Sequence, residues 1–428
     1  MKFRIVALLL LAGVFSSCQR QKEVAKDNNI TAIVGGTILG TSGQTPIADG
    51  ILLIQDGVIT AAGSRADFQI PEAATVVDAS GKFLMPGIIN AHGHIGDVEG
   101  LESGKYSRAN VIRDLKLNAF YGVTTINSLG GDQQVSIDIR NEQDTVKHNF
   151  SRIFVAGAVV AGDTPEEALR MVEENVAMGV DFIKIRIDDN LGTAEKMKPE
   201  VYEAVINRGA ELGIPVAAHI FYQEDAKAML RLGVKFIAHS VRDQIVDEDF
   251  IQLMLDKEAY YCPTLMREVS TFVYQETPAF FNDPFFLKAA DTALLLQLKE
   301  PERQQRIKES KTAQGYKRAL QIAMQNLKIL SDRGVKIAMG TDAGPPARFQ
   351  GYFEHEEMKL MVEAGLTTLQ ALEAGTKTAA ASIHQPRLGT LEKGNFADFL
   401  ILKNNPLEDI LHTRSIESVY IGGRKLPD

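Results

Sequence analysis

The stretch FLMPGIINAHGH, residues 83–94, places two histidines directly after a run of apolar residues. The run predicts a buried strand over Phe83–Asn90 that carries His92 and His94 at its carboxyl end. Side chains alternate along an extended chain, so the two imidazoles lie on the same side and can bind one ion. A lone His-x-His pair is more often structural, so the rest of the chain decides its meaning.

Further short apolar runs also end in, or contain, residues that bind metals or move protons. They are Asp181–Ile185 with Lys184, Pro215–His219, Phe236–His239 and Val335–Asp342. With Phe83–Asn90, Gly122–Asn127, Arg152–Gly157 and Ala259–Leu265 they give eight candidate strands. Amphipathic segments between most of them predict helices, for example Pro165–Met178, Pro199–Leu212 and Glu224–Leu232. Alternating strands and helices predict an α/β fold with a parallel sheet, and eight units predict a (β/α)8 TIM barrel with its site at the carboxyl ends of the strands.

The two ends of the chain have a different pattern, with short Val- and Ile-rich segments separated by glycines. These segments are Ile30–Leu39, Gly50–Ala61, Ala74–Leu84, Asp398–Leu402 and Ile416–Ile421. They predict a small β-sandwich-like domain composed of both termini, residues 30–85 and 386–428, around a barrel over residues 86–385.

The first residues read as an export signal. Lys2 and Arg4 precede an apolar segment, Ile5–Phe15, that is too short to span a bilayer. Phe15-Ser16-Ser17-Cys18 resembles a bacterial lipobox, with Phe where Leu is usual, and predicts lipidation of Cys18. The alternative is an ordinary signal peptide cut nearby. Residues 1–18 are thus a signal peptide and residues 19–29 a polar tether, and we expect an exported protein held on a periplasmic or outer-membrane surface of the bacterial cell envelope.

The amino-acid composition limits the classes of partner that we expect the protein to bind. The net charge of the 428-residue chain is −9, with no basic stripe, so nucleic acid is not an expected partner. If Cys18 is lipidated, Cys262 is the only thiol left, so no intramolecular disulfide forms and Cys262 is expected in the core. A small-molecule substrate and the membrane are the expected partners, and self-association into a homo-oligomer is left open.

Taken together, these motifs resemble the amidohydrolase superfamily, in particular its imidazolonepropionase-like and Xaa-Pro dipeptidase-like branch. The matching stretches are MPGIINAHGH (85–94), FIKI (182–185), AAH (217–219), IAHS (237–240), MGTDAG (339–344) and LGTLEKGNFAD (388–398). They span nearly the whole mature chain. The resemblance implies a (β/α)8 barrel with a composite β domain.

The resemblance also implies a site with two divalent metal ions, zinc being the best match to the ligands. His92, His94 and Asp342 would bind the more buried ion, and His219 and His239 the more exposed one. Lys184, carboxylated on its amine, would bridge them. A metal-bridging hydroxide would attack a carbonyl, and the candidate catalytic residues are Asp342, as general base and then acid, and His239.

The substrate pocket is less well matched. Relatives often carry a Gly-rich stretch after the lysine, whereas this chain has Arg186-Ile187-Asp188-Asp189-Asn190. Candidate substrate-binding residues are Arg186, Tyr222 and His355, the last of which could equally lie on a solvated helix face. Guanidinium groups match a carboxylate as a fork, so Arg242, Arg267 and Arg348 are further candidates, as is Tyr261. The long connection Met266–Lys311 either shapes the site or is a surface subdomain.

The sequence therefore favours an amidohydrolase that cleaves an amide C–N bond, in a dipeptide or an N-acyl amino acid. Opening of a cyclic amide, deamination and lactone hydrolysis use the same hydroxide and stay open as alternatives. A mononuclear enzyme and a non-catalytic solute- or metal-binding lipoprotein are the other two alternatives.

Overall fold

The computed structural model describes residues 30–40, 45–143 and 149–427. The predicted signal peptide, Cys18 and the tether lie outside these residues, so the predictions made for them stay predictions. Within the described ranges, no helix has both the length and the apolar character that a membrane crossing requires.

Strands β7 to β14 run parallel and form two groups, one of three strands in the order β7-β8-β9 and one of five in the order β10-β11-β12-β13-β14. Isolated parallel bridges join Val160 to Ile185 and Gly93 to Ala343, so the groups touch at both edges. The strands are β7 Ile88–Gly93, β8 Val123–Ser128, β9 Arg152–Val155, β10 Ile183–Arg186, β11 Val216–His219, β12 Phe236–Ala238, β13 Tyr260–Cys262 and β14 Lys336–Ile337. The predicted α/β architecture with parallel strands is confirmed, while closure into a barrel stays a prediction.

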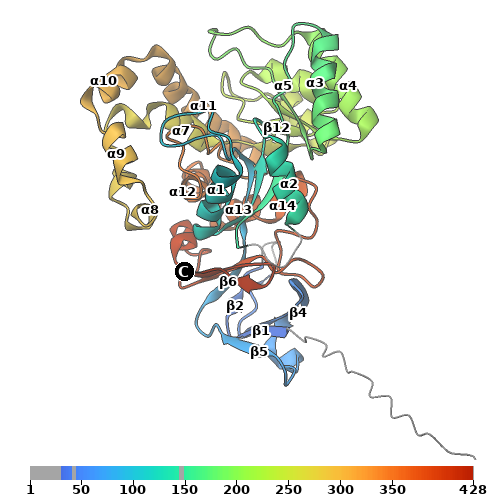
Figure 1. Ribbon diagram of the computed structural model, residues 1–428, viewed down its shortest axis with the longest axis vertical. Helices are drawn as coiled ribbons and strands as arrows, with labels where there is room; N and C mark the ends of the chain where they lie inside the picture. Colours follow the sequence, from blue (N-terminus) through green and yellow to red (C-terminus); the bar gives the residue numbers. More distant parts are fainter. Residues whose placement is uncertain (1–29, 41–44, 144–148, 428) are drawn as a thin grey trace, which may run out of the picture.

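Helices follow most of these strands and cover them (Figure 1). The sequence explains where these helices begin and end, as α3 shows. The side chain of Thr164 caps its start by accepting the Glu167 N–H, and Pro165 lies in its first turn. The helix stops at Gly179, which has a φ of 88°. The predicted helices Pro165–Met178 and Pro199–Leu212 match α3 and α4. The main helices are α1 Arg108–Phe120, α2 Gln134–Glu142, α3 Pro165–Met178, α4 Pro199–Leu212, α5 Gln223–Arg231, α6 Glu248–Asp256, α11 Lys311–Asp332, α12 Tyr352–Glu363, α13 Thr368–Ala374 and α14 Lys377–Ser382.

The two ends of the chain share a sheet at one end of the molecule (Figure 1). One sheet has the order β4-β3-β1-β5 and the other β17-β16-β15-β6-β2. Apolar side chains from both ends, including Leu52, Leu84, Phe399 and Tyr420, form one buried cluster there. The elements are β1 Ile30–Val34, β2 Thr37–Ile38, β3 Gly50–Gln55, β4 Val58–Ser64, η1 Arg65–Asp67, β5 Thr75–Asp78, β6 Phe83–Pro86, β15 Phe399–Leu402, η4 Ile410–Arg414, β16 Ile416–Ile421 and β17 Arg424–Lys425.

The prediction of a single strand over Phe83–Asn90 is wrong, because the chain changes partner at Gly87. β6 pairs with β15, whereas β7 pairs with β8. A Cβ on Gly87 would lie 2.1 Å from Thr124 Oγ1, so no larger residue fits at this crossing. Both halves are buried and apolar, which is why hydrophobicity alone shows no break.

The connection after β13 forms a helical arm on one side of the molecule (Figure 1). Its elements are α7 Leu265–Phe272, η2 Val273–Gln275, η3 Ala279–Asn282, α8 Pro284–Leu287, α9 Thr292–Leu298 and α10 Pro301–Glu309. Aromatic side chains join the arm to α12, with Phe286 and Tyr352 ring centroids 4.9 Å apart. The Tyr121 hydroxyl at the end of α1 donates to the Phe286 carbonyl at 2.7 Å. The arm is therefore packed against the body of the protein.

Candidate metal centre

The six predicted metal ligands come from the carboxyl ends of the parallel strands. They are His92 on β7, His94 directly after β7, Lys184 on β10, His219 at the end of β11, His239 directly after β12, and Asp342 after β14. Parallel strands bring their carboxyl ends to the same rim. Residues that lie up to 250 positions apart in the chain are thereby placed side by side.

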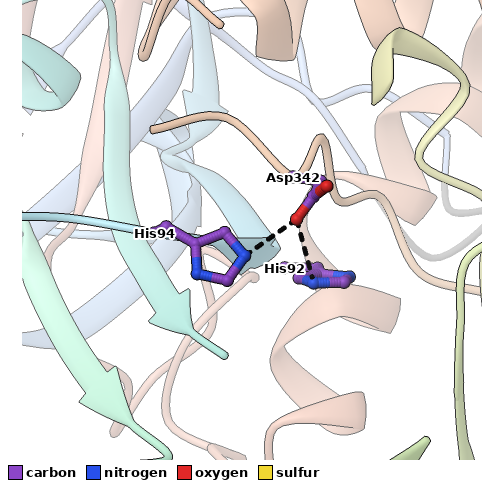
Figure 2. Close-up of side chains that lie close together, drawn as sticks. All are labelled: His92, His94 and Asp342. Atoms are coloured by element: carbon purple, nitrogen blue, oxygen red, sulfur yellow. Dashed lines mark hydrogen bonds and ion pairs between the residues drawn. The ribbon is translucent and has the colours of Figure 1, made fainter. Parts of the chain in front are cut away.

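His92, His94 and Asp342 form the tightest part of the cluster, as Figure 2 shows. Asp342 Oδ1 lies 2.8 Å from His94 Nε2 and 3.4 Å from His92 Nε2. The Asp342 N–H donates to the His92 carbonyl at 2.7 Å. A Cβ on Gly340 would come within 2.8 Å of the His92 backbone nitrogen, so this close approach requires glycine.

Lys184, His219 and His239 complete the cluster. Lys184 Nζ lies 3.1 Å from His92 Nε2. The His239 ring centroid lies 4.6 Å from that of His92 and 4.0 Å from that of His219. The side chain of His94 is 25% exposed, that of His219 13% and that of His92 only 1%. The cluster therefore reaches the surface at both ends, at His94 and at His219, and the prediction that the His219 and His239 half is the more exposed one is not supported.

Hydrogen bonds fix which ring nitrogen each histidine presents. His94 Nδ1 donates to the Gly130 carbonyl at 3.0 Å. His239 Nδ1 pairs with Thr264 Oγ1 at 2.6 Å, and His219 Nε2 donates to Asp188 Oδ2 at 2.9 Å. Each leaves the other nitrogen available as a ligand, an arrangement typical of metal-binding histidines.

Two buried ring nitrogens have no hydrogen-bond partner among the described residues, His239 Nε2 and His92 Nδ1. A buried polar atom without a partner is costly, and a bound ion would satisfy the one on His239, which lies next to the other donors. Imidazole nitrogens with one carboxylate are a donor set that suits zinc. The residues present therefore fit a divalent metal centre.

Burial sets the charge of these groups. It is the main cause that lowers the pKa of His92 and His239 well below the usual histidine value, and that of His219 to about 3. Neutral imidazoles keep the lone pair that a metal needs. Burial also lowers the pKa of Lys184 to about 8, which favours the neutral amine. Burial would raise the pKa of Asp342, but Arg348 and His94 hold it well below its usual value, so it is a carboxylate.

A buried polar triad, Asn90, Thr341 and Glu354, joins the strand of His92 to the loop of Asp342. Asn90 Nδ2 donates to Glu354 Oε1 at 2.6 Å and to Thr341 Oγ1 at 2.9 Å. Asn90 Oδ1 accepts the backbone N–H groups of His92 and Thr341 at 3.0 and 3.3 Å. The triad thus holds the two ligand-bearing segments in register.

The sequence did not single out two residues that contact the predicted ligands: Asp188 bonds His219, and Thr264 bonds His239. Arg348, predicted to bind a substrate carboxylate, has its Nη1 in contact with Asp342 Oδ2 instead. A signal for Asp188 existed, because residues 184, 186 and 188 alternate along an extended chain, which puts Asp188 on the side of Lys184. Thr264, with φ 48°, had no such signal.

The predicted substrate-binding residues lie in three different surroundings. Arg186 is exposed and its guanidinium bonds Asn190, and the Tyr222 hydroxyl donates to Asp189 Oδ1 at 2.9 Å. His355 is buried, not on a solvated helix face: its Nε2 donates to the Tyr121 carbonyl at 2.8 Å and its Nδ1 pairs with Thr413 Oγ1 at 2.9 Å. The structure does not bring His355 to the metal cluster. Cys262 is buried, as predicted.

Comparisons with known proteins agree with this geometry. Among solved structures, a Xaa-Pro dipeptidase with bound methionine superposes with a TM-score of 0.75 at 20% identity, over 94% of this chain and 100% of the other. Among curated proteins, ochratoxinase from Aspergillus niger is 25% identical, over 92% of this chain and 86% of its own. Imidazolonepropionase from Deinococcus radiodurans is 24% identical, over 89% and 92% of the two chains.

A family model described as "Amidohydrolase family" matches residues 83–426, which include all six residues of the cluster. The match covers most of the chain and confirms the resemblance drawn from the motifs. The chain belongs to the amidohydrolase family.

Proposed function

We propose that the protein is a hydrolase that cleaves an amide C–N bond in a dipeptide or an N-acyl amino acid, with two divalent metal ions, most suitably zinc. The observation that carries this proposal is the convergence of six ligand-type side chains from separate strands, with His239 Nε2 buried and unpartnered among the described residues. Membership of the amidohydrolase family supports hydrolysis of carbon–nitrogen bonds.

In this proposal His92, His94 and Asp342 would hold one ion, and His219 and His239 would hold the second. Lys184, carboxylated on its amine, would serve as a ligand to both. Carboxylation needs a neutral amine, and burial of Lys184 supports that form. A carbamate supplies two anionic oxygens, whereas an ammonium would repel the ions.

When bound, the two ions lower the pKa of a water molecule and polarise the substrate carbonyl. Asp342 accepts the proton of the attacking water on its carboxylate and returns it to the leaving nitrogen as the C–N bond breaks. Arg348, in contact with Asp342 Oδ2, keeps this carboxylate anionic before the transfer. His219 and His239, oriented by Asp188 and Thr264, form the side of the centre where the carbonyl would bind.

The proposal also covers the closure of the barrel, the domain formed by the two chain ends, and the attachment to the membrane. The two parallel groups form one (β/α)8 barrel, supported by the bridges at both of their edges. The sheets of the chain ends form a composite β domain, supported by the pairing of β6 with β15. The protein is exported and anchored through a lipid on Cys18, supported by the lipobox-like sequence.

The test is hydrolysis by the purified protein loaded with zinc and bicarbonate. A panel of dipeptides and N-acyl amino acids is incubated with the enzyme, and free amino acids are quantified by mass spectrometry. Turnover that stops after chelation and returns with zinc supports the proposal. A metal-loaded protein that is inert on this panel but opens cyclic amides, deaminates rings or hydrolyses lactones would replace it with one of those activities.

A further inference from the structure

A buried group of charged side chains lies beside His219, in the half of the candidate metal centre formed by His219 and His239. This group, the arginine cluster, consists of Arg242, Arg267, Glu268, Asp188 and Tyr316. Arg242 Nε lies 3.0 Å from Glu268 Oε1, and Arg267 Nη1 lies 3.1 Å from Glu268 Oε2. Arg242 and Glu268 have no exposed side-chain surface. Burying so many charged groups costs desolvation free energy, which is offset only when the groups pair with each other or with a ligand.

Two arginines of this cluster share one carboxylate. Arg242 and Arg267 both pair with Glu268, and Arg348 pairs instead with Asp342. Asp188 lies 4.0 Å from Arg242 and is also the hydrogen-bond acceptor of His219. Arg267 thus has no carboxylate of its own, which favours binding of an anionic ligand.

Arg267 is the member that borders the metal centre. It lies in the first turn of α7, three residues after Thr264, whose hydroxyl pairs with His239 Nδ1 at 2.6 Å. Its partner Glu268 also pairs with Arg242, which lies 4.0 Å from Asp188, the hydrogen-bond acceptor of His219. Arg267 therefore lies on the side of His219 and His239, where the substrate carbonyl is proposed to bind.

The guanidinium of Arg267 is held rigidly and still has a donor to offer. It stacks on the Tyr316 ring, with Cζ 4.1 Å from the ring centroid, and Nη2 donates to the Tyr316 hydroxyl at 3.2 Å. Nη1 is bound to Glu268. No described residue accepts a hydrogen bond from Nε. A fixed guanidinium loses little freedom when it binds a carboxylate.

We propose that Arg267 binds a free carboxylate of the substrate, and that the enzyme requires this carboxylate next to the amide bond that it cleaves. The proposal rests on the proposed amide hydrolysis and adds its main specificity determinant. Glu268, Arg242 and Tyr316 act as positioning residues that hold Arg267. A dipeptide C-terminus and the carboxylate of an N-acyl amino acid have the same chemistry and satisfy the requirement equally.

The first experiment compares paired substrates on the zinc-loaded enzyme. Each N-acyl amino acid or dipeptide is tested beside its C-terminal carboxamide, which keeps the shape and removes the charge. We expect wild type to prefer the acid by about 100-fold or more in kcat/KM, since a charge-assisted hydrogen bond in a buried site is strong. Arg267→Met is expected to lose this preference, because kcat/KM falls more for the acid than for the carboxamide, with the loss on the acid seen mainly in KM.

Two further variants separate binding from folding. Tyr316→Phe keeps the ring but removes the hydroxyl, and we expect a partial loss of acid preference with an unchanged circular dichroism spectrum. Arg318→Met, an exposed arginine on the same helix as Tyr316, is the matched control and should behave as wild type. An equal loss on acid and carboxamide in Arg267→Met, or a wild type that does not prefer the acid, would overturn the proposal.

A second readout does not depend on turnover. Calorimetry of zinc-loaded protein with 3-phenylpropionate, and with its neutral isostere 4-phenylbutan-2-one, measures carboxylate binding without a scissile bond. Tighter binding of the carboxylate by wild type, weakened about tenfold or more in Arg267→Met, supports the subsite even if no substrate in the panel is hydrolysed. Equal carboxylate binding by both proteins, or none by wild type, would contradict it.

Discussion

Lys184 Nζ lies 3.1 Å from His92 Nε2, and both side chains are almost fully buried. A charged ammonium is a poor neighbour for metal ligands in such a place, whereas a carboxylated amine would join the two halves of the cluster. The Lys184–His92 pair is therefore the point at which a two-metal centre and a one-metal centre differ.

Replacement of Lys184 by alanine distinguishes a two-metal centre from a one-metal centre. We expect Lys184→Ala to bind one ion or fewer per chain and to lose about 1,000-fold or more of kcat/KM, because the bridging ligand supports both ions. Metal content by mass spectrometry and steady-state kinetics measure this, with the loop variant Lys198→Ala as control. Two retained ions with full activity would show that Lys184 is not a ligand.

Asp188 should matter for metal affinity without touching the metal. Its carboxylate accepts the His219 Nε2–H at 2.9 Å, and loss of such a partner costs about 10–100-fold in metal affinity. We expect this loss in Asp188→Asn, measured by competition with a chromogenic chelator. Asp189→Asn is the matched control, because Asp189 pairs with Tyr222 and not with a ligand. Equal metal affinities in the two variants would show that Asp188 does not support metal binding through His219.

Asp342 combines metal binding with proton transfer. Asp342→Asn keeps one oxygen that can coordinate but cannot carry the proton, so we expect kcat to fall about 100- to 10,000-fold while much of the bound metal is retained. Rapid-mixing kinetics and metal analysis of the same sample separate the two effects. Asp332→Asn, on the exposed end of α11, is the control. If the activity of Asp342→Asn falls only in proportion to its bound metal, Asp342 acts as a ligand and not as the proton carrier.

The ionisation of Glu354 is expected to make the free energy of unfolding depend on pH. Burial raises its pKa from 4.5 to about 7, and Oε2 has no partner among the described residues. Folded protein thus holds a proton on Glu354 that unfolded protein loses above pH 4.5, so the stabilisation is present at low pH and is lost as pH rises through about 7.

Glu354→Gln removes this titration and keeps an oxygen for Asn90 and Thr341. We expect the variant to be more stable than wild type at pH 8, by about 3 kcal/mol at most, and similar to it at pH 4.5. Urea unfolding of metal-free protein at both pH values gives the comparison, with Glu363→Gln as a surface control. A pH-independent difference between Glu354→Gln and wild type would refute the role of this ionisation.

The sequence predicted what depends on local pattern. The carboxyl ends of the strands followed from apolar runs such as Pro215–His219, and two helices were predicted with the ends that the structure has, since their proline, capping and glycine residues mark them. The six candidate ligands were chosen from residue type and from the family motifs, and the structure brings them together, while metal binding by them stays a prediction.

What could not be predicted depends on contacts between distant segments. The change of partner at Gly87 is caused by Thr124 and β15, which no pattern near residue 87 reveals. His355 was a reasonable candidate by position, yet Tyr121 and Thr413 occupy both of its nitrogens. The arginine cluster likewise depends on Tyr316, which lies 49 residues after Arg267.

The crossing at Gly87 ties the first two histidines of the cluster to the last part of the chain. β6 takes β15 as its antiparallel partner, and only Gly87 separates β6 from β7, which carries His92 and is followed directly by His94. A chain that lacks Phe399–Leu402 leaves β6 without that neighbour, so the support of these two histidines depends on residues near the other end of the sequence. If the cluster binds metal as proposed, a C-terminal truncation that removes β15 is expected to weaken metal binding.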